Sequence, residues 1–260
     1  MNGGKMNETL EVINSLCSVH GNFSGKEVSD EDLESILKAS VRTANSSARQ
    51  PYSIVVVRDK ETQKSLGYSG SVMLVYNIDL YRQYSLAEYL GFKRPRISYY
   101  ELLTAATDTA MAMQTACLAA TSLGIDSLVT NCVHRGDISR VYRLLNLPER
   151  ECFPLIALVL GYPVSEPERR KGRLCDQSII HRGTYKIPDE EELKRISALY
   201  DEPDMSLLQP RYRTKGYSRY LGWFFKEWCR YEEKGTSTLR KTDSDTVMEA
   251  LMKAGFCPEI

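Results

Sequence analysis

The sequence predicts an α+β fold of layered α/β type, in which helices flank a central sheet. Four apolar segments of strand length, 53–58, 71–78, 126–132 and 153–160, alternate with segments of helical character. Strands separated by helices of ten or more residues are typical of a layered sheet. The longest helix is expected over 102–123 and is apolar on nearly every side. Either the core or a second subunit must cover such a helix.

The composition excludes several classes of protein. At 260 residues, the chain fits one large or two small domains. Its 34 basic and 34 acidic residues cancel, so its charge indicates neither nucleic acid nor an anionic membrane as a partner. No apolar run approaches the roughly 18 residues of a membrane span. The seven cysteines are scattered and form no Cys-x-x-Cys pair, so we expect no disulfide framework and a reducing, cytoplasmic location.

Two helices precede the first strand. Residues 9–16 carry apolar side chains with helical spacing, which predicts a short amphipathic helix. A second helix should begin after Ser29, whose spacing to Asp32 resembles a capping box. The first strand, 53–58, is rich in β-branched residues, and a charged helix over 59–66 leads from it to the second strand.

The chain after the fourth strand has a different character. Beyond Pro188 it becomes charged, and helices are expected over 190–200, 217–231 and 245–254. We therefore expect one domain over 1–187 and a helical C-terminal extension over 188–260. The extension should pack on the core or on a partner subunit.

The segment 80–100 allows more than one interpretation. It interleaves tyrosines with basic residues, namely Tyr81, Tyr84, Tyr89, Tyr99 and Tyr100 with Arg82, Lys93, Arg94 and Arg96. Such a pattern can bind single-stranded nucleic acid. The net charge of zero favours a half-buried lid or a subunit contact instead.

The stretch 42–52 is polar, rich in short side chains, and leads directly into the first strand. Asn45, Ser46 and Gln50 would stand at the mouth of that strand, where they can hydrogen-bond a planar polar ligand. A solvated loop between a helix and a strand explains the same composition equally well. The rest of the chain has to decide between the two.

Three further polar stretches lie at the ends of predicted elements, where ligands tend to bind. They are 18–20, 129–134 and the basic cluster 169–173, which suits a single phosphate or a solvated loop. Cys132 and His134 resemble half a metal site, but no third ligand is indicated, so we expect no metal. His134 is also a candidate proton donor.

The order of these stretches resembles the flavin-dependent nitroreductase family over about residues 9–185. Members begin with Arg-Arg-Ser-x-Arg-x-Phe, where this chain has 16–23, and continue with Pro-Ser-x-x-Asn-x-Gln-Pro-Trp, where it has 44–52. Four further motifs follow in the family's order: Leu-Gly-Ile-x-Ser at 123–127, Leu-Pro-Glu at 147–149, Leu-Gly-Tyr-Pro at 160–163 and Lys-x-Arg at 171–173. The chain departs from the family at Leu16 and Cys17, which replace the leading arginines, and at Asn45 and Ala48.

The resemblance implies a nitroreductase-like fold with a mostly antiparallel central sheet, and a homodimer with FMN at the subunit interface. It implies that Ser46 and Gln50 hydrogen-bond the flavin ring and that backbone N–H groups near Thr130 face the flavin N5 atom. The full set of implied FMN contacts is Ser18, His20, Arg42, Asn45, Ser46, Gln50, Val129, Thr130, Asn131, Lys171 and Arg173.

The implied activity is that of an FMN-dependent oxidoreductase with NADH or NADPH as the reductant. The flavin carries the redox chemistry, and a nitroaromatic, quinone or related small acceptor is reduced in a ping-pong cycle. Two alternatives stay open. One is a specialised flavin reductase or dehydrogenase that acts on one metabolite, with 80–100 as its lid. The other is a flavin-binding store or sensor without efficient turnover.

Overall fold

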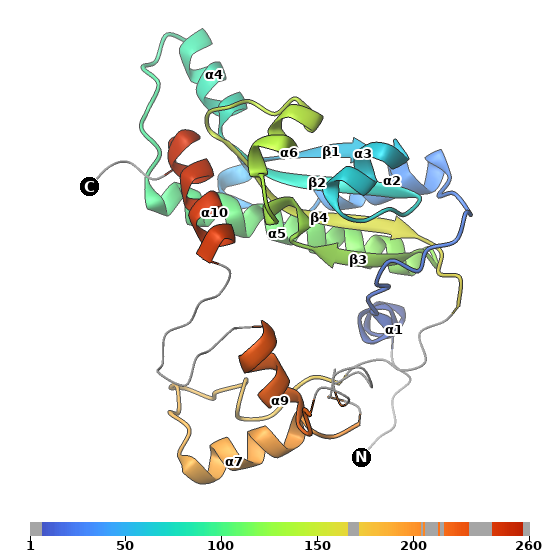
Figure 1. The fold of residues 1–260 in the computed structure, drawn as a ribbon. Helices are drawn as coiled ribbons and strands as arrows, with labels where there is room; N and C mark the ends of the chain where they lie inside the picture. The colour runs from blue at the N-terminus through green and yellow to red at the C-terminus, as the bar shows by residue number, and fades with distance from the viewer. Residues whose placement is uncertain are drawn as a thin grey trace. The chain divides into compact units, whose positions relative to one another are not determined.

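The structure is a computed structural model that describes residues 7–165, 172–203, 205, 213, 216–228 and 241–256 (Figure 1). The chain forms two compact units, Met1–Glu166 together with Thr242–Ile260, and Pro167–Lys241. The predicted division into domains at 187/188 stays a prediction. In the structure, the last helix belongs with the first unit.

A four-stranded sheet forms the centre of the first unit. Its strands are β1 (Tyr52–Val57), β2 (Val72–Asp79), β3 (Asp126–Thr130) and β4 (Cys152–Gly161), in the order β1-β2-β4-β3. Every neighbouring pair is antiparallel. The predicted antiparallel sheet flanked by helices is therefore confirmed. β3 is shorter than the predicted strand because the chain turns after Thr130 into the 3-10 helix η2 (Cys132–His134).

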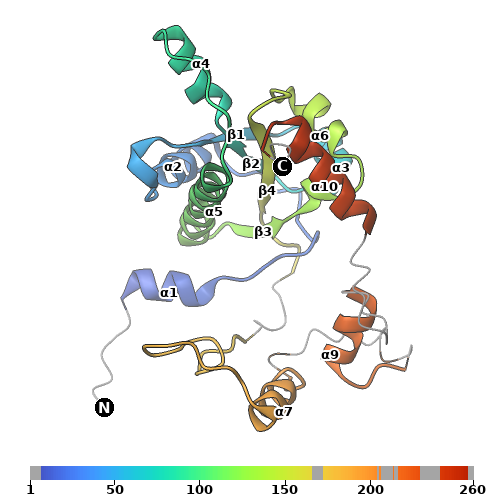
Figure 2. The same cartoon turned by 90° about the vertical axis from the view of Figure 1, so that its left-hand side faces the viewer.

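Helices cover both faces of this sheet, as Figure 2 shows. On one face lie α2 (Asp30–Val41) and α5 (Tyr99–Ser122), which pack on β2 side chains such as Leu74 and Tyr76. On the other face lie α3 (Lys60–Leu66) and α6 (Ile138–Leu145), around Met73 and Val75. The short helix α1 (Glu8–Ser15) contacts α5. Strand residues alternate between the two faces, so β2 supplies both cores.

The long helix α5 is buried on one side only. Its small residues Ala112, Ala116 and Ala120 are buried against the sheet and α2. On its outer side, Leu103 is 68% exposed. The expected cover for this side by a second subunit stays a prediction.

The segment 80–100 forms an arm that projects from the first unit in both views (Figures 1 and 2). It contains helix α4 (Tyr81–Tyr89), of which Tyr84 is buried. The return of the arm is fixed by Arg94, which pairs with Glu151 and Glu88. Its outer apolar side chains are exposed, among them Leu86, Tyr89, Leu90, Phe92 and Tyr100.

The last helix, α10 (Lys241–Lys253), and the residues after it pack on the end of the sheet. Ala254 and Phe256 are buried in a cluster with Ile78, Leu80 and Phe153. The Ala254 carbonyl accepts a hydrogen bond from the Glu151 N–H at 2.8 Å. The residue that follows α10 is thereby joined to the residue that precedes β4.

The second unit contains α7 (Glu190–Leu199), α9 (Tyr220–Trp223) and the π-helical turn η3 (Phe224–Trp228). A helix was expected over 217–231. Its described part begins at Tyr220 and changes to π-helical geometry at Phe224, while 229–231 lie outside the described residues. Tyr220 is buried, with its ring near those of Tyr200, Trp223 and Phe224.

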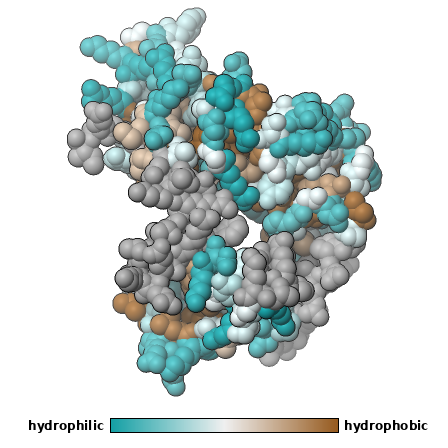
Figure 3. Space-filling model, in the orientation of Figure 1, coloured by the Kyte–Doolittle hydropathy of each residue, from teal (hydrophilic) through white to brown (hydrophobic). Residues whose placement is uncertain are grey.

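Polar side chains dominate the face drawn in Figure 3, and apolar side chains appear on it in separate small areas. Among the helices that the structure describes, none combines the length and the hydropathy needed to cross a bilayer.

Candidate functional site

The residues predicted for the site form two groups on the first unit. The loop group consists of Arg42, Asn45, Ser46 and Gln50, which precede β1. The edge group consists of Ser18, His20, Val129, Thr130 and Asn131, which lie along β3. The geometry of each group follows from the element that it adjoins.

The loop group lies on a strained turn. Residues Ser46–Ala48 form a single 3-10 turn, η1, between α2 and β1. Ser47, Ala48 and Gln50 have left-handed φ angles of 54°, 53° and 50°. Residues with a Cβ atom adopt this region at a cost of about 1–3 kcal/mol each, unless the surroundings impose it. The surroundings of this loop must therefore supply the restraint.

Two hydrogen bonds restrain the loop, one to helix α5 and one within the loop itself. The Ser46 N–H donates to Oδ2 of Asp108 at 3.0 Å, and Asp108 is a buried residue of α5. The Gln50 N–H donates to Oδ1 of Asn45 at 3.3 Å. The N–H groups of Ser46 and Gln50 are thus bound by side chains of the protein itself. In the described part of the chain, the Ser46 hydroxyl and the Gln50 amide form no hydrogen bond and are available to a ligand.

The helix α4 holds the same loop from its other side. Arg82 donates from Nη2 to the Gln50 carbonyl at 2.5 Å, and Gln83 donates from Nε2 to the Arg49 carbonyl at 2.7 Å. Arg42 is the exposed C-cap residue of α2, just before the loop. Its guanidinium gives the loop group a positive charge.

The edge group lies along the outer side of β3. Ser18 forms an isolated bridge with Ser127, and the Val19 N–H donates to the Ser127 carbonyl at 3.0 Å. Ser18 and His20 are exposed next to this bridge. At the end of β3, the hydroxyl of Thr130 accepts from the Cys132 N–H at 3.2 Å, and Asn131 is exposed where the chain turns.

The structure does not bring the two groups together within one chain. β1 and β3 are the opposite edge strands of the sheet. Three strand spacings separate them, which corresponds to about 14 Å. Within one chain, the width of the sheet therefore separates the loop group from the edge group.

Only the last two residues of the basic cluster 169–173 belong to the part of the chain that the structure describes. Lys171 lies outside the described residues. Arg173 is exposed in the second unit and donates to the Gly172 carbonyl at 2.9 Å. The phosphate role predicted for both residues stays a prediction.

Cys132 and His134 are packed into the protein rather than gathered around an open site. Burial raises the pKa of the Cys132 thiol, so this thiol is protonated at neutral pH. The Nε2 atom of His134 lies 2.7 Å from the Pro154 carbonyl, which fixes the proton on that nitrogen. Burial lowers the pKa of His134. A proton-donor role for His134 stays a prediction that this hydrogen bond does not favour.

Replacing His134 with glutamine is expected to reduce the loss of stability in acid. The folded-state pKa lies below the ordinary value of about 6.5, so the unfolded chain binds the proton more readily. The free energy of unfolding should therefore fall as the pH drops from 7 through the lowered pKa. Glutamine keeps a donor for the Pro154 carbonyl but does not titrate. Urea denaturation at pH 7.5 and pH 5.5 measures the difference, and equal acid sensitivity of both proteins would contradict this prediction.

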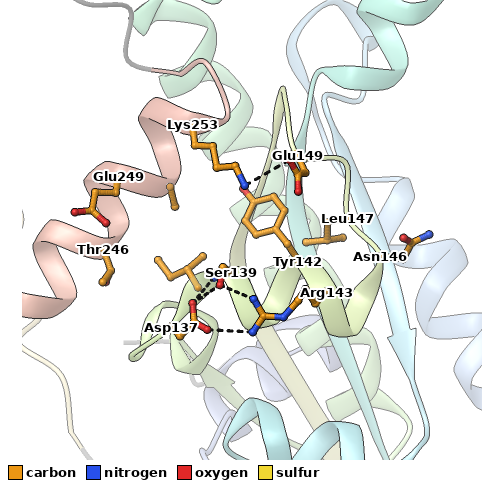
Figure 4. A pocket seen from close by; sticks show the side chains of 12 residues that line it. Asp137, Ser139, Tyr142, Arg143, Asn146, Leu147, Glu149, Thr246, Glu249 and Lys253 are labelled. Carbon is orange, nitrogen blue, oxygen red and sulfur yellow. Dashed lines mark hydrogen bonds and ion pairs between the residues drawn. The ribbon is translucent and has the colours of Figure 1, made fainter.

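A cavity of about 470 Å³ lies elsewhere on the first unit, between α6 and α10 (Figure 4). Two ion pairs lie among the residues that line it. Asp137 pairs with Arg143 at 3.2 Å, and Lys253 pairs with Glu149 at 3.4 Å. None of the predicted site residues lines it. Four of its charged side chains form these two ion pairs, whereas the Ser46 hydroxyl and the Gln50 amide beside β1 form no hydrogen bond among the described residues.

Sequence reasoning missed the three side chains that hold the loop, Asp108, Arg82 and Gln83. A signal existed for Asp108, since it is an acidic residue within the apolar part of a predicted helix. No signal existed for Arg82 and Gln83, because their contact with the loop depends on the pairing of β1 with β2.

Comparison with known proteins places the chain among flavin-related reductases. The profile of the Nitroreductase family matches residues 94–162. An oxygen-insensitive NADPH nitroreductase of Salmonella typhimurium is 30% identical over 81% of this chain and 85% of its own length. An FMN reductase [NAD(P)H] of Bacillus subtilis is 27% identical over 96% of this chain and 98% of its own length.

Solved structures show the same fold. Nitroreductase A from Vibrio parahaemolyticus superimposes with a TM-score of 0.68 at 26% identity and covers 75% of this chain and 84% of its own. The hypothetical oxidoreductase YcnD from Bacillus subtilis superimposes with a TM-score of 0.79 at 24% identity, over 98% of this chain and 100% of its own. At that identity, the second likeness concerns the fold alone.

Proposed function

The chain belongs to the nitroreductase family, and from this membership we propose that it is an FMN-dependent oxidoreductase that uses NADH or NADPH to reduce a small acceptor. The observation that carries this proposal is the relation to the Salmonella enzyme over most of both chains. Relatives named as FMN reductases and NADPH-dependent oxidoreductases support the cofactor and the reductant.

The residues of the two groups fit FMN. The free hydroxyl of Ser46 and the free amide of Gln50 are suited to the polar edge of a flavin ring. Arg42 can direct a positive charge, and His20 a ring N–H donor, toward a phosphate. In the part of the chain described here, none of these four side chains is engaged elsewhere. Arg42, together with Arg49, Lys171 and Arg173, would replace the positive charge that the family's arginines supply at the positions of Leu16 and Cys17.

When bound, FMN would supply two-electron redox chemistry between the nicotinamide and the acceptor, which in our proposal react in a ping-pong order. The protein's part is to bind and orient. The restrained loop presents Ser46 and Gln50 in a fixed geometry. Backbone N–H groups near Thr130 and Asn131 would stabilise negative charge by preorganised hydrogen bonding.

We propose a homodimer in which the loop group of one chain meets the edge group of the other. Two observations support it. The groups lie on opposite edges of the sheet in a single chain. The arm and the outer side of α5 also expose apolar side chains such as Tyr89 and Leu103, which a second chain would cover.

The proposed function has several candidate electron acceptors. A nitroaromatic or quinone is the first candidate. A free flavin is the second, because the Bacillus subtilis relative that aligns with nearly the whole chain is named an FMN reductase. The third candidate concerns the function as a whole and is a flavin-binding store or sensor without efficient turnover.

The cytoplasm stays the proposed location. The five described cysteines are free thiols, which a reducing compartment would preserve.

Purified protein is expected to bind FMN and to lose its yellow colour when NADH or NADPH is added without oxygen. Stopped-flow absorbance measures the reduction, and addition of nitroaromatics, quinones or free FMN to the reduced protein then identifies the acceptor. Sedimentation of the loaded protein should give the mass of two chains.

Each outcome separates the candidates. Protein that neither binds FMN nor is stabilised by it against heat would refute all three. Protein that binds FMN but is not reduced by either nicotinamide would favour the store or sensor. Rapid reoxidation by free flavin, with slow reoxidation by the other acceptors, would favour the flavin reductase.

A further inference from the structure

The antiparallel pairing of β1 with β2 brings the start of the arm next to the loop group. Tyr52 pairs with Ile78, so the residue before β1 and the last residue of β2 lie side by side. The Asp79 N–H donates to the Pro51 carbonyl at 2.9 Å and closes this end of the pair. Helix α4 begins two residues later, which places its first turn against Arg49 and Gln50.

That first turn donates to two consecutive carbonyls of the loop. Arg82 binds the Gln50 carbonyl at 2.5 Å, and Gln83 binds the Arg49 carbonyl at 2.7 Å. The Arg82 bond is charge-assisted, and such bonds are stronger than neutral ones. Both bonds act on the peptide groups that flank the left-handed Gln50.

We propose that Arg82 and Gln83 are positioning residues for the flavin, which hold the strained loop in its binding conformation from outside the site. This inference rests on the proposed function. The two donors offset part of the cost of the left-handed residues before the ligand arrives. Binding then does not have to order the loop, and ordering a flexible segment would weaken affinity.

The position of α4 itself depends on contacts outside the loop. Tyr84 is buried and its hydroxyl donates to Oε1 of Glu101 at 3.0 Å. Arg94 anchors the return of the arm to Glu151. These contacts are made away from Arg82 and Gln83, so removing the two donors should leave the helix in place and release only the loop.

The test measures FMN affinity and apoprotein stability in parallel. Arg82→Ala and Gln83→Ala are each expected to weaken FMN binding by about three- to tenfold, in line with the loss of one hydrogen bond. Fluorescence titration of the full-length apoprotein gives the dissociation constant. The urea midpoint of the apoprotein should stay close to that of the unmodified protein. Arg82→Lys, which keeps a positive donor, should recover part of the affinity.

Lys38→Ala is the matched control. Lys38 is an exposed cation on α2, and no hydrogen bond or ion pair of its side chain occurs among the described residues. Its removal should leave FMN affinity unchanged. If Arg82→Ala proves unstable, Gln83→Ala and Arg82→Lys carry the test.

The results distinguish this inference from the proposed function. If the unmodified protein binds FMN and both alanine variants bind it equally well, the positioning role is refuted while the function stands. If the unmodified protein does not bind FMN, the proposed function itself fails. The alanine variants could also lose affinity together with a matching loss of apoprotein stability, and Arg82→Lys could fail to recover the affinity. That combined result would show a structural role only and would also overturn the inference.

Discussion

Replacing Glu151 with alanine is expected to lower the free energy of unfolding by about 3–5 kcal/mol, the range seen when one partner of a buried ion pair is removed. The Arg94 side chain is 13% exposed and that of Glu151 is 11% exposed. Arg94 donates from Nε to Oε1 of Glu151 at 2.6 Å, and a second bond joins Nη2 to Oε2. The alanine variant would leave the guanidinium desolvated, with the exposed Glu88 carboxylate and the Tyr81 ring as its neighbours.

Glu151 also joins three parts of the first unit through its backbone. Its carbonyl accepts from the N–H groups of Leu80 and Tyr81 at the start of the arm, and its N–H donates to Ala254. The residue has a left-handed φ of 59°, which these contacts impose. The backbone and the carboxylate of Glu151 thus hold different parts of one region, since the carboxylate binds Arg94 in the arm.

Urea denaturation of the full chain measures the Glu151 effect. The double variant Glu151→Met with Arg94→Met should be less costly than Glu151→Ala, because it leaves no buried charge unpaired. Lys64→Ala serves as the control, since its ion pair with Glu61 is exposed and should contribute less than about 1 kcal/mol. A Glu151→Ala cost as small as that of the control would show that the buried pair does not hold the arm.

Asp108→Ala is expected to weaken FMN binding by roughly 10- to 100-fold, while the free energy of unfolding changes by less than about 1 kcal/mol. The carboxylate accepts the Ser46 N–H at 3.0 Å from a buried position on α5. Hydrogen bonds to charged groups contribute about 1.5–3 kcal/mol, and about 1.4 kcal/mol corresponds to a tenfold change in affinity. Removing the buried carboxylate also removes its desolvation cost, which limits the effect on stability.

Asp108→Asn is the matched variant for this prediction. Its amide oxygen can still accept from the Ser46 N–H, so its FMN affinity should lie between those of the unmodified protein and of Asp108→Ala. Fluorescence titration of the apoproteins gives the affinities, and urea denaturation gives the stabilities. Equal affinity of all three proteins would mean that the loop needs no restraint from α5.

The strands and the long helix could be predicted because their signals are local. A β-branched run such as 53–57 fits a pleated surface wherever the sheet is formed. The sequence of the arm was ambiguous because some of its tyrosines and basic residues anchor it to the protein and others are exposed. Composition alone does not distinguish the two sets. Tyr84 and Arg94 are buried or paired, whereas Tyr89 and Tyr100 are exposed.

For the loop group, the sequence predicted the candidate residues but not their conformation or the side chains that restrain them. Asn45, Ser46 and Gln50 could be selected as candidates from their polarity and their place before a strand. The left-handed backbone of this loop could not be foreseen, since Ser47, Ala48 and Gln50 are not the glycines that usually adopt it. The restraint comes from Asp108 and Arg82, which lie far away along the chain.

The sequence by itself determined the layered sheet, the long apolar helix and the family, because periodicity and ordered motifs are properties of neighbouring residues. Only the tertiary structure decided that the predicted site residues form two groups, one at each edge of the sheet, and that α4 and α5 hold one of them. The physical reason is that strand pairing and buried hydrogen bonds join residues that are distant in the chain, such as Ser46 with Asp108 and Gln50 with Arg82.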